Sequence, residues 1–348
     1  MTSPLFSPFT LRGLALRNRI VLSPMLMYMA EEDGRVSDRH FVHYGARALG
    51  GTGLIMTEVV AVTPRGRISA RDMGLWEDGQ VDGLRRVASF LHDCGAALGV
   101  QLAHAGRKSQ LEGRSEAPSA VVFDEGYETP EAMSETAIRA LVQAYVEATH
   151  RAVKADVDLI QIHAAHGYLL HSFLCELTNQ RQDAYGGSLE GRARLVLEIV
   201  EAVRGAWPDD RPLSVRMTAL DPHAGGVTEA DAEWLALRFR ELGVDLLDVT
   251  TGNLVPQYTA PVFPGYQVPY AERLRRATGL AVATVGSLAA ADLAEELIGN
   301  GRTDLVCIGR ELIRNPNWPI ACARRAGVNL ELPIPTYTRA TDAYERGF

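Results

Sequence analysis

Cysteine and lysine are both scarce in this chain. Its 348 residues include only two lysines, Lys108 and Lys154, and four cysteines: Cys94, Cys175, Cys307 and Cys322. No two of these cysteines have the spacing of zinc ligands or of a redox-active pair. We therefore expect free, reduced thiols, no metal site, and a cytoplasmic location.

Net positive charge and long apolar runs are also lacking. The formal net charge is −8, so the chain has no basic surface of the kind that binds nucleic acid. No apolar run approaches the roughly 18 residues that a membrane span requires. Residues 1–10 do not have the basic start and apolar centre of a signal peptide. Neither nucleic acid nor a membrane is expected as a partner.

The sequence does contain a regular alternation of short apolar strands and amphipathic helices. Strands are expected at residues 19–22, 53–62, 98–102, 157–162, 213–217, 244–249, 280–285 and 305–308. Helices are expected at residues 38–49, 80–97, 136–154, 189–207, 228–242, 270–277, 289–298 and 315–326. Eight strands, each followed by a helix, predict an α/β protein with a single (β/α)8 TIM barrel. A doubly wound parallel sheet is the alternative.

Two segments lie outside this repeating pattern. Residues 4–18 have closely spaced apolar residues and a turn at Arg12-Gly13, which predicts an N-terminal hairpin. Residues 104–135, after the third strand, form a long loop rich in Gly, Pro, Ser and Glu, which is typical of a lid. No linker interrupts the chain, so residues 1–348 are predicted to form one domain, with residues 332–348 as its tail.

The fourth predicted strand ends in a polar run. His163, His166 and Tyr168 follow the apolar residues 157–162, and in a barrel such residues lie at the carboxyl-terminal, catalytic face. The two histidines could be interior residues with satisfied hydrogen bonds, or a zinc pair that lacks a third ligand. They could instead stabilise a carbonyl oxygen that gains negative charge, with Tyr168 as a nearby acid.

The ends of the other strands also carry candidate site residues. Gly286 and Ser287 follow the seventh strand and Gly309 and Arg310 the eighth, where barrels of this type bind phosphate. Arg216, the lone charge at residues 213–217, needs either a carboxylate or an anionic ligand such as the N1–C2=O2 edge of a reduced flavin. A phosphate-bearing ligand is therefore predicted. The remaining candidates at this face are Ser23, Pro24, Met25, Leu26, Tyr28, Ala61 and Gln101.

Several motifs together resemble the Old Yellow Enzyme family of FMN-dependent ene-reductases, in its thermophilic-like branch. The motifs are residues 18–25, which include Ser23-Pro24-Met25, residues 101–108 (QLAHAGRK), residues 163–169 (HAAHGYL), residues 179–188 (NQRQDAYGGS), Gly309-Arg310 and residues 344–348 (YERGF). Residues 179–188 are the most specific of these, and the resemblance runs along nearly the whole chain.

The resemblance implies an NAD(P)H-dependent enzyme that reduces the C=C bond of α,β-unsaturated carbonyl compounds by hydride transfer from flavin N5 to Cβ. It implies that His163 and His166 bind the substrate carbonyl and that Tyr168 protonates Cα. The residues that it places against the isoalloxazine are Ser23, Pro24, Met25, Ala61, Gln101 and Arg216. Those that it places around the ribityl phosphate are Gly286, Ser287, Gly309 and Arg310.

Three further residues would shape the substrate pocket. Tyr28 would line it as a hydrogen-bond donor, and Arg346 would reach it from a neighbouring subunit, which implies a homodimer or a tetramer built from dimers. Leu26 stands where the branch usually has cysteine, so we expect an apolar pocket wall and a flavin potential that thiol reagents do not change. Phe348 stands where the branch usually has tryptophan.

Three other functions were considered. A dienoyl-CoA reductase of the same fold would carry an iron–sulfur cysteine cluster and extra domains after the barrel. The isolated Cys307 and Cys322 do not form such a cluster. A non-redox barrel enzyme would need a Schiff-base lysine or a catalytic carboxylate at a strand end, and neither Lys108 nor Lys154 fits well. A flavin-binding sensor would hold FMN without turnover. Bound FMN would separate the ene-reductase from the non-redox enzyme, and reduction of cyclohexenone by NADPH would separate it from the sensor.

Overall fold

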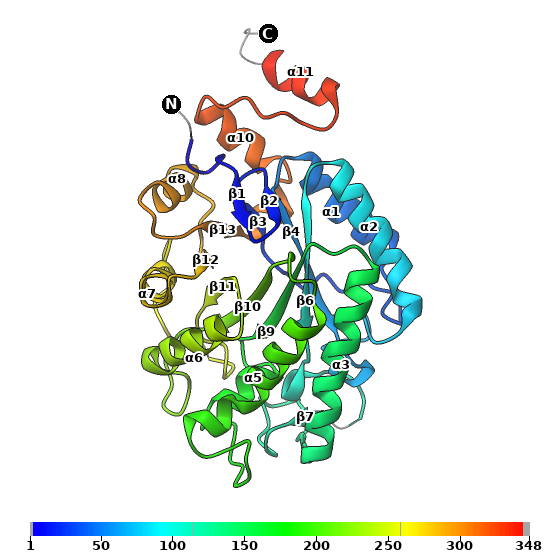
Figure 1. Ribbon diagram of the computed structural model, residues 1–348, viewed down its shortest axis with the longest axis vertical. Helices are drawn as coiled ribbons and strands as arrows, with labels where there is room; N and C mark the ends of the chain where they lie inside the picture. The colour runs from blue at the N-terminus through cyan, green and yellow to red at the C-terminus, as the bar shows by residue number, and fades with distance from the viewer. Residues whose placement is uncertain (1–2, 114, 258, 344–348) are drawn as a thin grey trace.

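A closed barrel of eight parallel strands lies within residues 3–113, 115–257 and 259–343, which are those that the computed structural model describes. The neighbouring strands pair in parallel around the barrel, and β3 pairs with both β13 and β4, which closes it. The prediction of a single TIM barrel is therefore confirmed (Figure 1). The barrel strands are β3 (Ile20–Leu22), β4 (Leu54–Ala61), β6 (Ala97–Ala103), β9 (Leu159–Ala164), β10 (Leu213–Thr218), β11 (Leu246–Thr250), β12 (Ala281–Thr284) and β13 (Leu305–Ile308).

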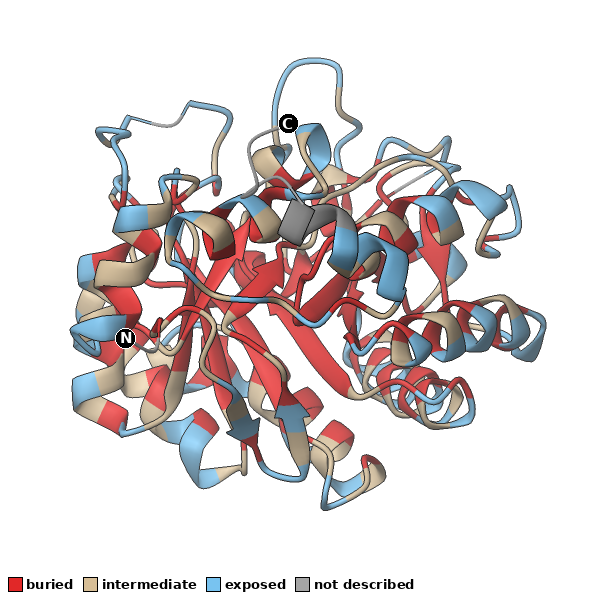
Figure 2. Ribbon diagram, turned by 90° about the horizontal axis from the view of Figure 1, so that it is seen from above, coloured by how far each residue is buried: buried red, intermediate tan, exposed pale blue. Residues whose placement is uncertain are grey.

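Helices surround the barrel and cover the outer face of its strands. Figure 2 shows the strands buried at the centre, with the helices exposed on their outward sides. Amphipathic helices explain this arrangement, as in α2, where Leu84, Val87 and Leu91 are buried. The helices are α1 (Asp38–Leu49), α2 (Val81–Asp93), α3 (Glu135–Lys154), α4 (Leu169–Leu174), α5 (Leu189–Ala206), α6 (Glu229–Glu241), α7 (Val268–Thr278), α8 (Ala291–Gly299), α9 (Arg310–Arg314), α10 (Trp318–Arg325) and α11 (Pro335–Ala343).

The predicted N-terminal hairpin forms and closes one end of the barrel. β1 (Phe9–Leu11) pairs with β2 (Leu14–Leu16) across the turn at Arg12 and Gly13. Leu11 and Leu16 pack with residues at the start of the barrel strands, such as Leu54 and Leu159. The amino-terminal end is thus filled with apolar side chains, which leaves the opposite end available for a ligand.

The long segment after β6 covers part of that opposite end. It contains a short helical turn (Gly106–Lys108) and two short strands, β7 (Glu116–Ala117) and β8 (Glu131–Ala132), which pair with each other in parallel. Glu116 lies 3.5 Å from Arg65, so an ion pair links the segment to the loop after β4, and Glu116 also lies 3.5 Å from the ring of His104. The predicted long loop is confirmed, but it is held by specific contacts.

One helix boundary and one strand boundary were wrong, and one short helix was missed. α2 ends at Asp93 rather than at residue 97, because Gly95 adopts a left-handed conformation (φ +71°) and the chain then enters β6. β9 extends to Ala164, so His163 belongs to the strand itself. The short helix α4 was missed because its six residues are all buried and show no polar face.

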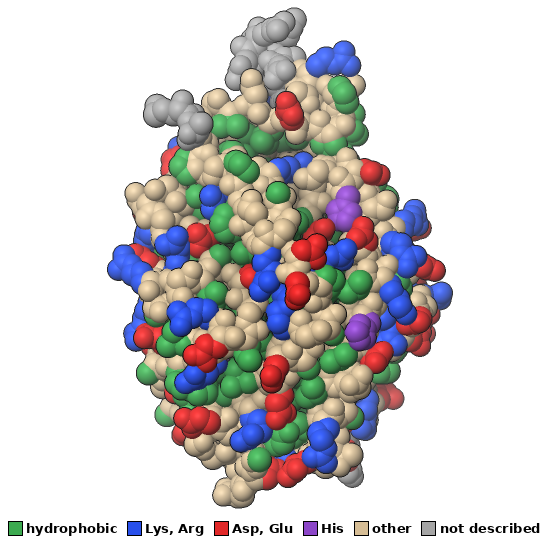
Figure 3. Space-filling model, in the orientation of Figure 1, with side chains coloured by type: hydrophobic (Ala, Val, Ile, Leu, Met, Phe, Trp, Pro, Cys, Tyr) green, Lys and Arg blue, Asp and Glu red, His purple; other side chains and the backbone are tan. Residues whose placement is uncertain are grey.

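Figure 3 shows acidic and basic side chains interspersed over one face of the molecule. Among the described residues, no helix is long and apolar enough to cross a membrane. The four cysteines are free and buried. The predicted contacts of Arg346 and Phe348 fall outside the described residues.

Candidate active site

A cavity of about 260 Å³ opens at the carboxyl-terminal end of the barrel strands. It is lined by residues from seven strands and the segments that follow them, far apart in the sequence. Its lining residues are Ser23, Pro24, Met25, Leu26, Val59, Gln101, His163, His166, Tyr168, Arg216, Val285, Gly309 and Arg310. The structure thus brings together eleven of the predicted site residues.

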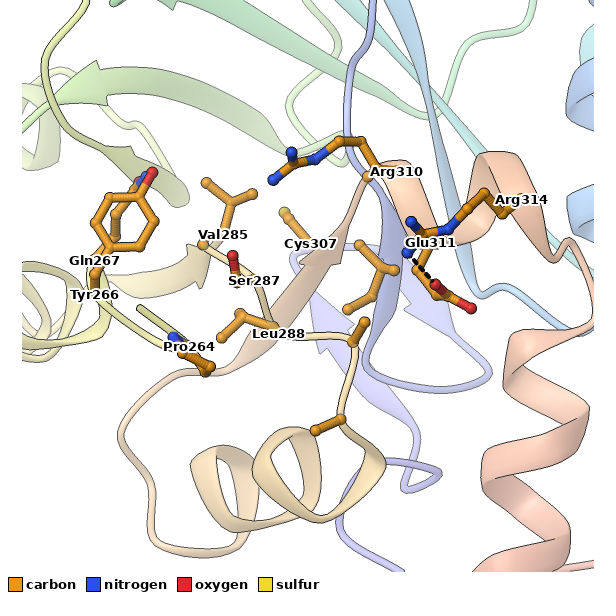
Figure 4. A pocket seen from close by; sticks show the side chains of 15 residues that line it. Pro264, Tyr266, Gln267, Val285, Ser287, Leu288, Cys307, Arg310, Glu311 and Arg314 are labelled. Atoms are coloured by element: carbon orange, nitrogen blue, oxygen red, sulfur yellow. Dashed lines mark hydrogen bonds and ion pairs between the residues drawn. The ribbon is translucent and has the colours of Figure 1, made fainter. Parts of the chain in front are cut away.

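A second cavity of about 580 Å³ adjoins the first and shares Val285, Gly309 and Arg310 with it. Gly286 and Ser287, predicted to hold a phosphate, line this second cavity. Figure 4 shows Arg310 directed toward Val285, whereas Arg314 is turned toward Glu311, with which it forms an ion pair of 2.6 Å. Arg310 is therefore the arginine available to an anion in this cavity.

The turn after β9 sets the orientation of the histidines and the tyrosine. His166 (φ +60°) and Gly167 (φ +72°) are consecutive left-handed residues, a conformation that favours glycine. A Cβ atom at Gly167 would lie 2.6 Å from the carbonyl oxygen of Asn253, so only glycine fits. The Gly167 N–H donates to His171 Nδ1 at 2.7 Å. This turn places Tyr168 beside His163, with ring centroids 5.1 Å apart.

Both site histidines are neutral near neutral pH. Burial holds the pKa of His163 and of His166 well below the usual value, and the charge of Arg216 lowers it further. The two rings are nearly perpendicular, with centroids 5.3 Å apart. His166 Nε2 lies 2.9 Å from Thr250 Oγ1, whereas His163 Nδ1 has no hydrogen-bond partner among the described residues. A neutral imidazole can donate one hydrogen bond to a ligand without carrying a buried charge.

Lys108 is a site residue that the sequence analysis did not assign. Its Nζ lies 5.0 Å from the centroid of the Tyr168 ring and donates to the carbonyl oxygen of His166 at 3.0 Å. Burial, followed by the charge of Arg107, lowers the pKa of Lys108 to about 8. Burial also raises the pKa of Tyr168, which keeps its hydroxyl protonated. Two features of the sequence could have identified Lys108: lysine is scarce in the chain, and Lys108 follows the third predicted strand.

Arg216 has a carboxylate partner in the floor of the site. Its Nε lies 3.3 Å from Asp248 Oδ2, and both side chains are buried. The two groups form an ion pair but are not aligned for a hydrogen bond, since Nε has no hydrogen-bond partner among the described residues. Of the two partners considered for Arg216, a carboxylate is therefore present, and a donor remains free for a ligand. Asp248 and Gln161 were missed, although each interrupts an apolar strand.

The loop after β3 is held by a buried pair. The Met27 N–H donates to Glu58 Oε2 at 2.8 Å, and Glu58 Oε1 lies 2.6 Å from His40 Nε2. This contact positions the loop that carries Leu26 and Tyr28. Tyr28 has a left-handed backbone (φ +55°) and is 55% exposed. Leu26 packs, together with Tyr168, against a small apolar cluster of Val59, Ile68, Ala103 and Ala105.

Three predicted site residues are not among those that line either cavity. Ala61 is buried at the end of β4, and Tyr28 lies at the exposed edge of the loop after β3. Arg346 lies outside the described residues. The other predicted positions all line one cavity or both.

One cluster of possible metal ligands, His171, Cys175 and Asp221, lies beside the site. His171 Nδ1 accepts the Gly167 N–H, so the ring proton is on Nε2, which lies 3.0 Å from Asp221 Oδ2. A metal bound at Nε2 would require the proton on Nδ1, where the backbone N–H already points. The cluster is therefore explained as a buried contact between the His171 ring and the Asp221 carboxylate, with the Cys175 thiol beside it.

The residues of the two cavities fit a flavin mononucleotide. His163 Nδ1, Arg216 Nε and Gln267 Oε1 are buried and have no hydrogen-bond partner within the described part of the chain. A buried polar atom without a hydrogen-bond partner destabilises the folded protein unless a ligand supplies that partner. The larger cavity has Arg310 and the turn at Gly286 for a phosphate, and the smaller one has Arg216 and Gln101 for a polar ring edge.

Comparisons with known proteins agree with this chemistry. A sequence model of the family described as NADH:flavin oxidoreductase / NADH oxidase matches residues 4–327. The NADPH dehydrogenase of Geobacillus thermodenitrificans is 48% identical over 349 aligned residues, which cover 100% of this chain and 99% of that protein.

Two solved structures have the same fold. Morphinone reductase in complex with tetrahydroNAD aligns with a TM-score of 0.80 and 30% identity, covering 96% of this chain and 93% of that one. A 2-naphthoyl-CoA reductase in complex with 2-naphthoyl-CoA aligns with a TM-score of 0.88 and 25% identity, covering 93% of this chain. This chain spans about half the length (52%) of that second protein.

Proposed function

Because the chain belongs to the NADH:flavin oxidoreductase / NADH oxidase family, the Old Yellow Enzyme family, and is an FMN-dependent NAD(P)H oxidoreductase, we propose that it reduces the C=C bond of α,β-unsaturated carbonyl compounds. The observation that carries the proposal is the convergence of His163, His166 and Tyr168 on one cavity with Arg216. The three side chains can bind a substrate oxygen and deliver a proton in the same space.

The proposed FMN site spans the two adjoining cavities. The isoalloxazine would contact Gln101 and Arg216, together with Ser23, Pro24, Met25 and Ala61. The ribityl phosphate would lie against Gly286, Ser287, Gly309 and Arg310, which line the larger cavity. When bound, FMN takes a hydride from NAD(P)H and supplies it from N5 to Cβ of the alkene.

His163 and His166 would hold the carbonyl oxygen of the substrate. Reduction at Cβ places negative charge on that oxygen, so fixed N–H donors stabilise the transition state more than the ground state. Neutral rings suit this role, because each keeps a lone N–H donor and neither carries a buried charge.

Tyr168 would donate the proton to Cα. Its hydroxyl stays protonated because burial raises its pKa. Lys108, with its ammonium 5.0 Å from the ring centroid of Tyr168, would favour the loss of that proton when the alkene is reduced. The two roles are thus separate: the histidines would bind the carbonyl oxygen of the substrate, and Tyr168 would protonate its Cα.

Leu26 and Tyr28 would line the entrance to the substrate pocket. Leu26 contributes an apolar wall beside Tyr168, supported by Val59 and Ile68. We further propose that residues 1–348 act as one domain in the cytoplasm. The family resemblance suggests a homodimer or a tetramer built from dimers, in which Arg346 completes a neighbouring pocket.

Anaerobic turnover of 2-cyclohexenone with NADPH tests the proposal. We expect cyclohexanone to form in a one-to-one ratio with the NADPH consumed, because the alkene is the only electron acceptor present. Oxidation of NADPH only after oxygen is admitted, with no cyclohexanone formed, would contradict the proposed reaction while leaving the enzyme an NADPH dehydrogenase.

A further inference from the structure

We propose that Asp248 is a positioning residue that holds Arg216 and offsets its charge, and that it thereby sets the reduction potential of the bound FMN. This inference rests on the proposed placement of FMN against Arg216 and Gln101. Asp248 itself does not line either cavity. Its action on the cofactor would be through Arg216.

A continuous polar chain crosses four adjacent strands under the site. Gln101 on β6 lies opposite Gln161 on β9, and its Nε2 donates to Gln161 Oε1 at 2.6 Å. Gln161 Nε2 in turn donates to Asp248 Oδ2 on β11 at 3.3 Å. Arg216 on β10 lies opposite Asp248, with its Nε 3.3 Å from the same oxygen. The two side chains proposed to contact the flavin are therefore connected through Gln161 and Asp248.

Asp248 is in an unusual place for a carboxylate. It is 1% exposed and lies between Leu247 and Val249 in the middle of a buried strand. Its Oδ1 has no hydrogen-bond partner among the described residues, so its charge depends on Arg216 and Gln161. A buried charge with so few partners is costly to the fold, and an apolar residue would fill the space more cheaply. A role at the site accounts for its presence.

The expected role follows from the signs of the charges. Reduced flavin gains negative charge at the N1–C2=O2 edge, which a cation nearby stabilises and an anion destabilises. Arg216 supplies the cation, and Asp248 on its far side partly cancels the field in a region of low dielectric constant. Removal of the Asp248 charge should therefore favour the reduced flavin and shift the potential in the positive direction.

Spectroelectrochemical titration of the holoenzyme tests the inference. We would compare the unmodified protein with Asp248→Asn, Asp248→Ser, Ser214→Ala and Arg216→Gln. Ser214→Ala is the matched neutral control, because Ser214 Oγ accepts from the same Gln161 Nε2 at 3.3 Å but carries no charge. We expect both Asp248 variants to favour reduced over oxidised FMN by about tenfold, which is about +30 mV for a two-electron couple. Ser214→Ala should leave the potential unchanged.

Each other outcome has a definite meaning. An unchanged or more negative potential in the Asp248 variants, or an equal shift in Ser214→Ala, would overturn the inference. So would loss of FMN from both Asp248 variants but not from Ser214→Ala, since Asp248 would then serve the fold. If Arg216→Gln shifts the potential in the negative direction and the Asp248 variants leave it unchanged, the inference about Asp248 is wrong but the proposed FMN placement stands. If Arg216→Gln also leaves the potential unchanged, the proposed FMN placement is wrong as well.

Discussion

Tyr168 is the residue whose role can be separated most cleanly from that of the cofactor. Tyr168→Phe removes the hydroxyl and retains the ring that packs beside Leu26 and His163. We expect alkene reduction to slow by roughly 10²-fold, a common contribution of a positioned acid. Flavin reduction by NADPH should change little, because it needs no proton from Tyr168. Stopped-flow measurement of the two half-reactions would show this, and equal slowing of both would contradict the acid role.

The role of His163 in binding the substrate oxygen can be tested by the binding of phenols. A phenolate oxygen resembles the negatively charged substrate oxygen, so it should bind to the same donors. His163→Ala should weaken phenol binding by about 1–3 kcal/mol, the usual effect of losing a hydrogen bond to a charged group. Titration of the flavin absorbance with p-chlorophenol measures the dissociation constant. An unchanged dissociation constant would contradict the proposed role of His163 in binding the substrate oxygen.

Because position 26 is a leucine and not a cysteine, we expect that thiol reagents do not change the reduction potential of the flavin. The cysteine nearest to the proposed cofactor site, Cys307, lines the larger cavity but is only 3% exposed, and burial raises the pKa of its thiol well above the usual value. Treatment with iodoacetamide should leave the flavin potential unchanged. Leu26→Cys is the matched control and should make the potential sensitive. A large shift in the unmodified protein would contradict the prediction.

The residues that the sequence made recognisable lie near the ends of the predicted strands or just after them. His163, His166, Tyr168, Arg216 and Arg310 could be named because polar residues at strand ends meet at one face of a barrel. Asp248 and Gln161 could not be named in the same way, since they lie in the middle of strands. Their roles depend on which strands are neighbours around the barrel, and this is known only when the barrel is closed.

At the scale of elements, the loop after β3 depends on one buried carboxylate. Glu58→Ala would leave both the Met27 N–H and His40 Nε2 without their partner, which should cost about 1–3 kcal/mol of unfolding free energy. Glu58→Gln keeps an acceptor for one of them and should cost less. Urea denaturation of the two variants measures the difference. Equal costs would show that the hydrogen bonds do not hold this loop.

The helices and strands were largely predictable, and their ends were less so. Short, nearly continuous apolar runs located each barrel strand, because a buried parallel strand is apolar on both faces. The start of α6 was also close to the predicted residue 228, because Thr228 caps the helix and accepts from the Asp231 N–H at 3.2 Å. The end of α2 was wrong because Gly95 stops the helix before its apolar pattern ends. The pairing of β7 with β8 left no signal in the polar sequence.

At the scale of the whole molecule, Lys108 should make stability depend on pH. Its pKa is lowered to about 8 from an ordinary 10.5, so between these values the unfolded chain binds more protons than the folded one. Stability should therefore rise as the pH increases from about 8 toward 10.5. Lys108→Met should reduce this rise, whereas Lys154→Met, at the only other lysine, should not. Thermal melts across this range would show it, and identical pH profiles for the two variants would contradict it.

The architecture explains why one end of the molecule carries all the proposed chemistry. The β1–β2 hairpin fills the amino-terminal end of the barrel, and the two cavities open at the other end. The proposed phosphate site after β12 and β13 and the histidines at the end of β9 line two adjoining cavities. A flavin that spans the two cavities would therefore meet a substrate held by His163 and His166.

The most direct test of this account is a single turnover with the reduced holoenzyme. The enzyme would be reduced under anaerobic conditions with one equivalent of NADPH and then mixed with 2-cyclohexenone while the flavin spectrum is recorded. The account predicts that the oxidised flavin spectrum returns and that one equivalent of cyclohexanone forms. A flavin that stays reduced with the alkene, and is reoxidised only by oxygen, would contradict it.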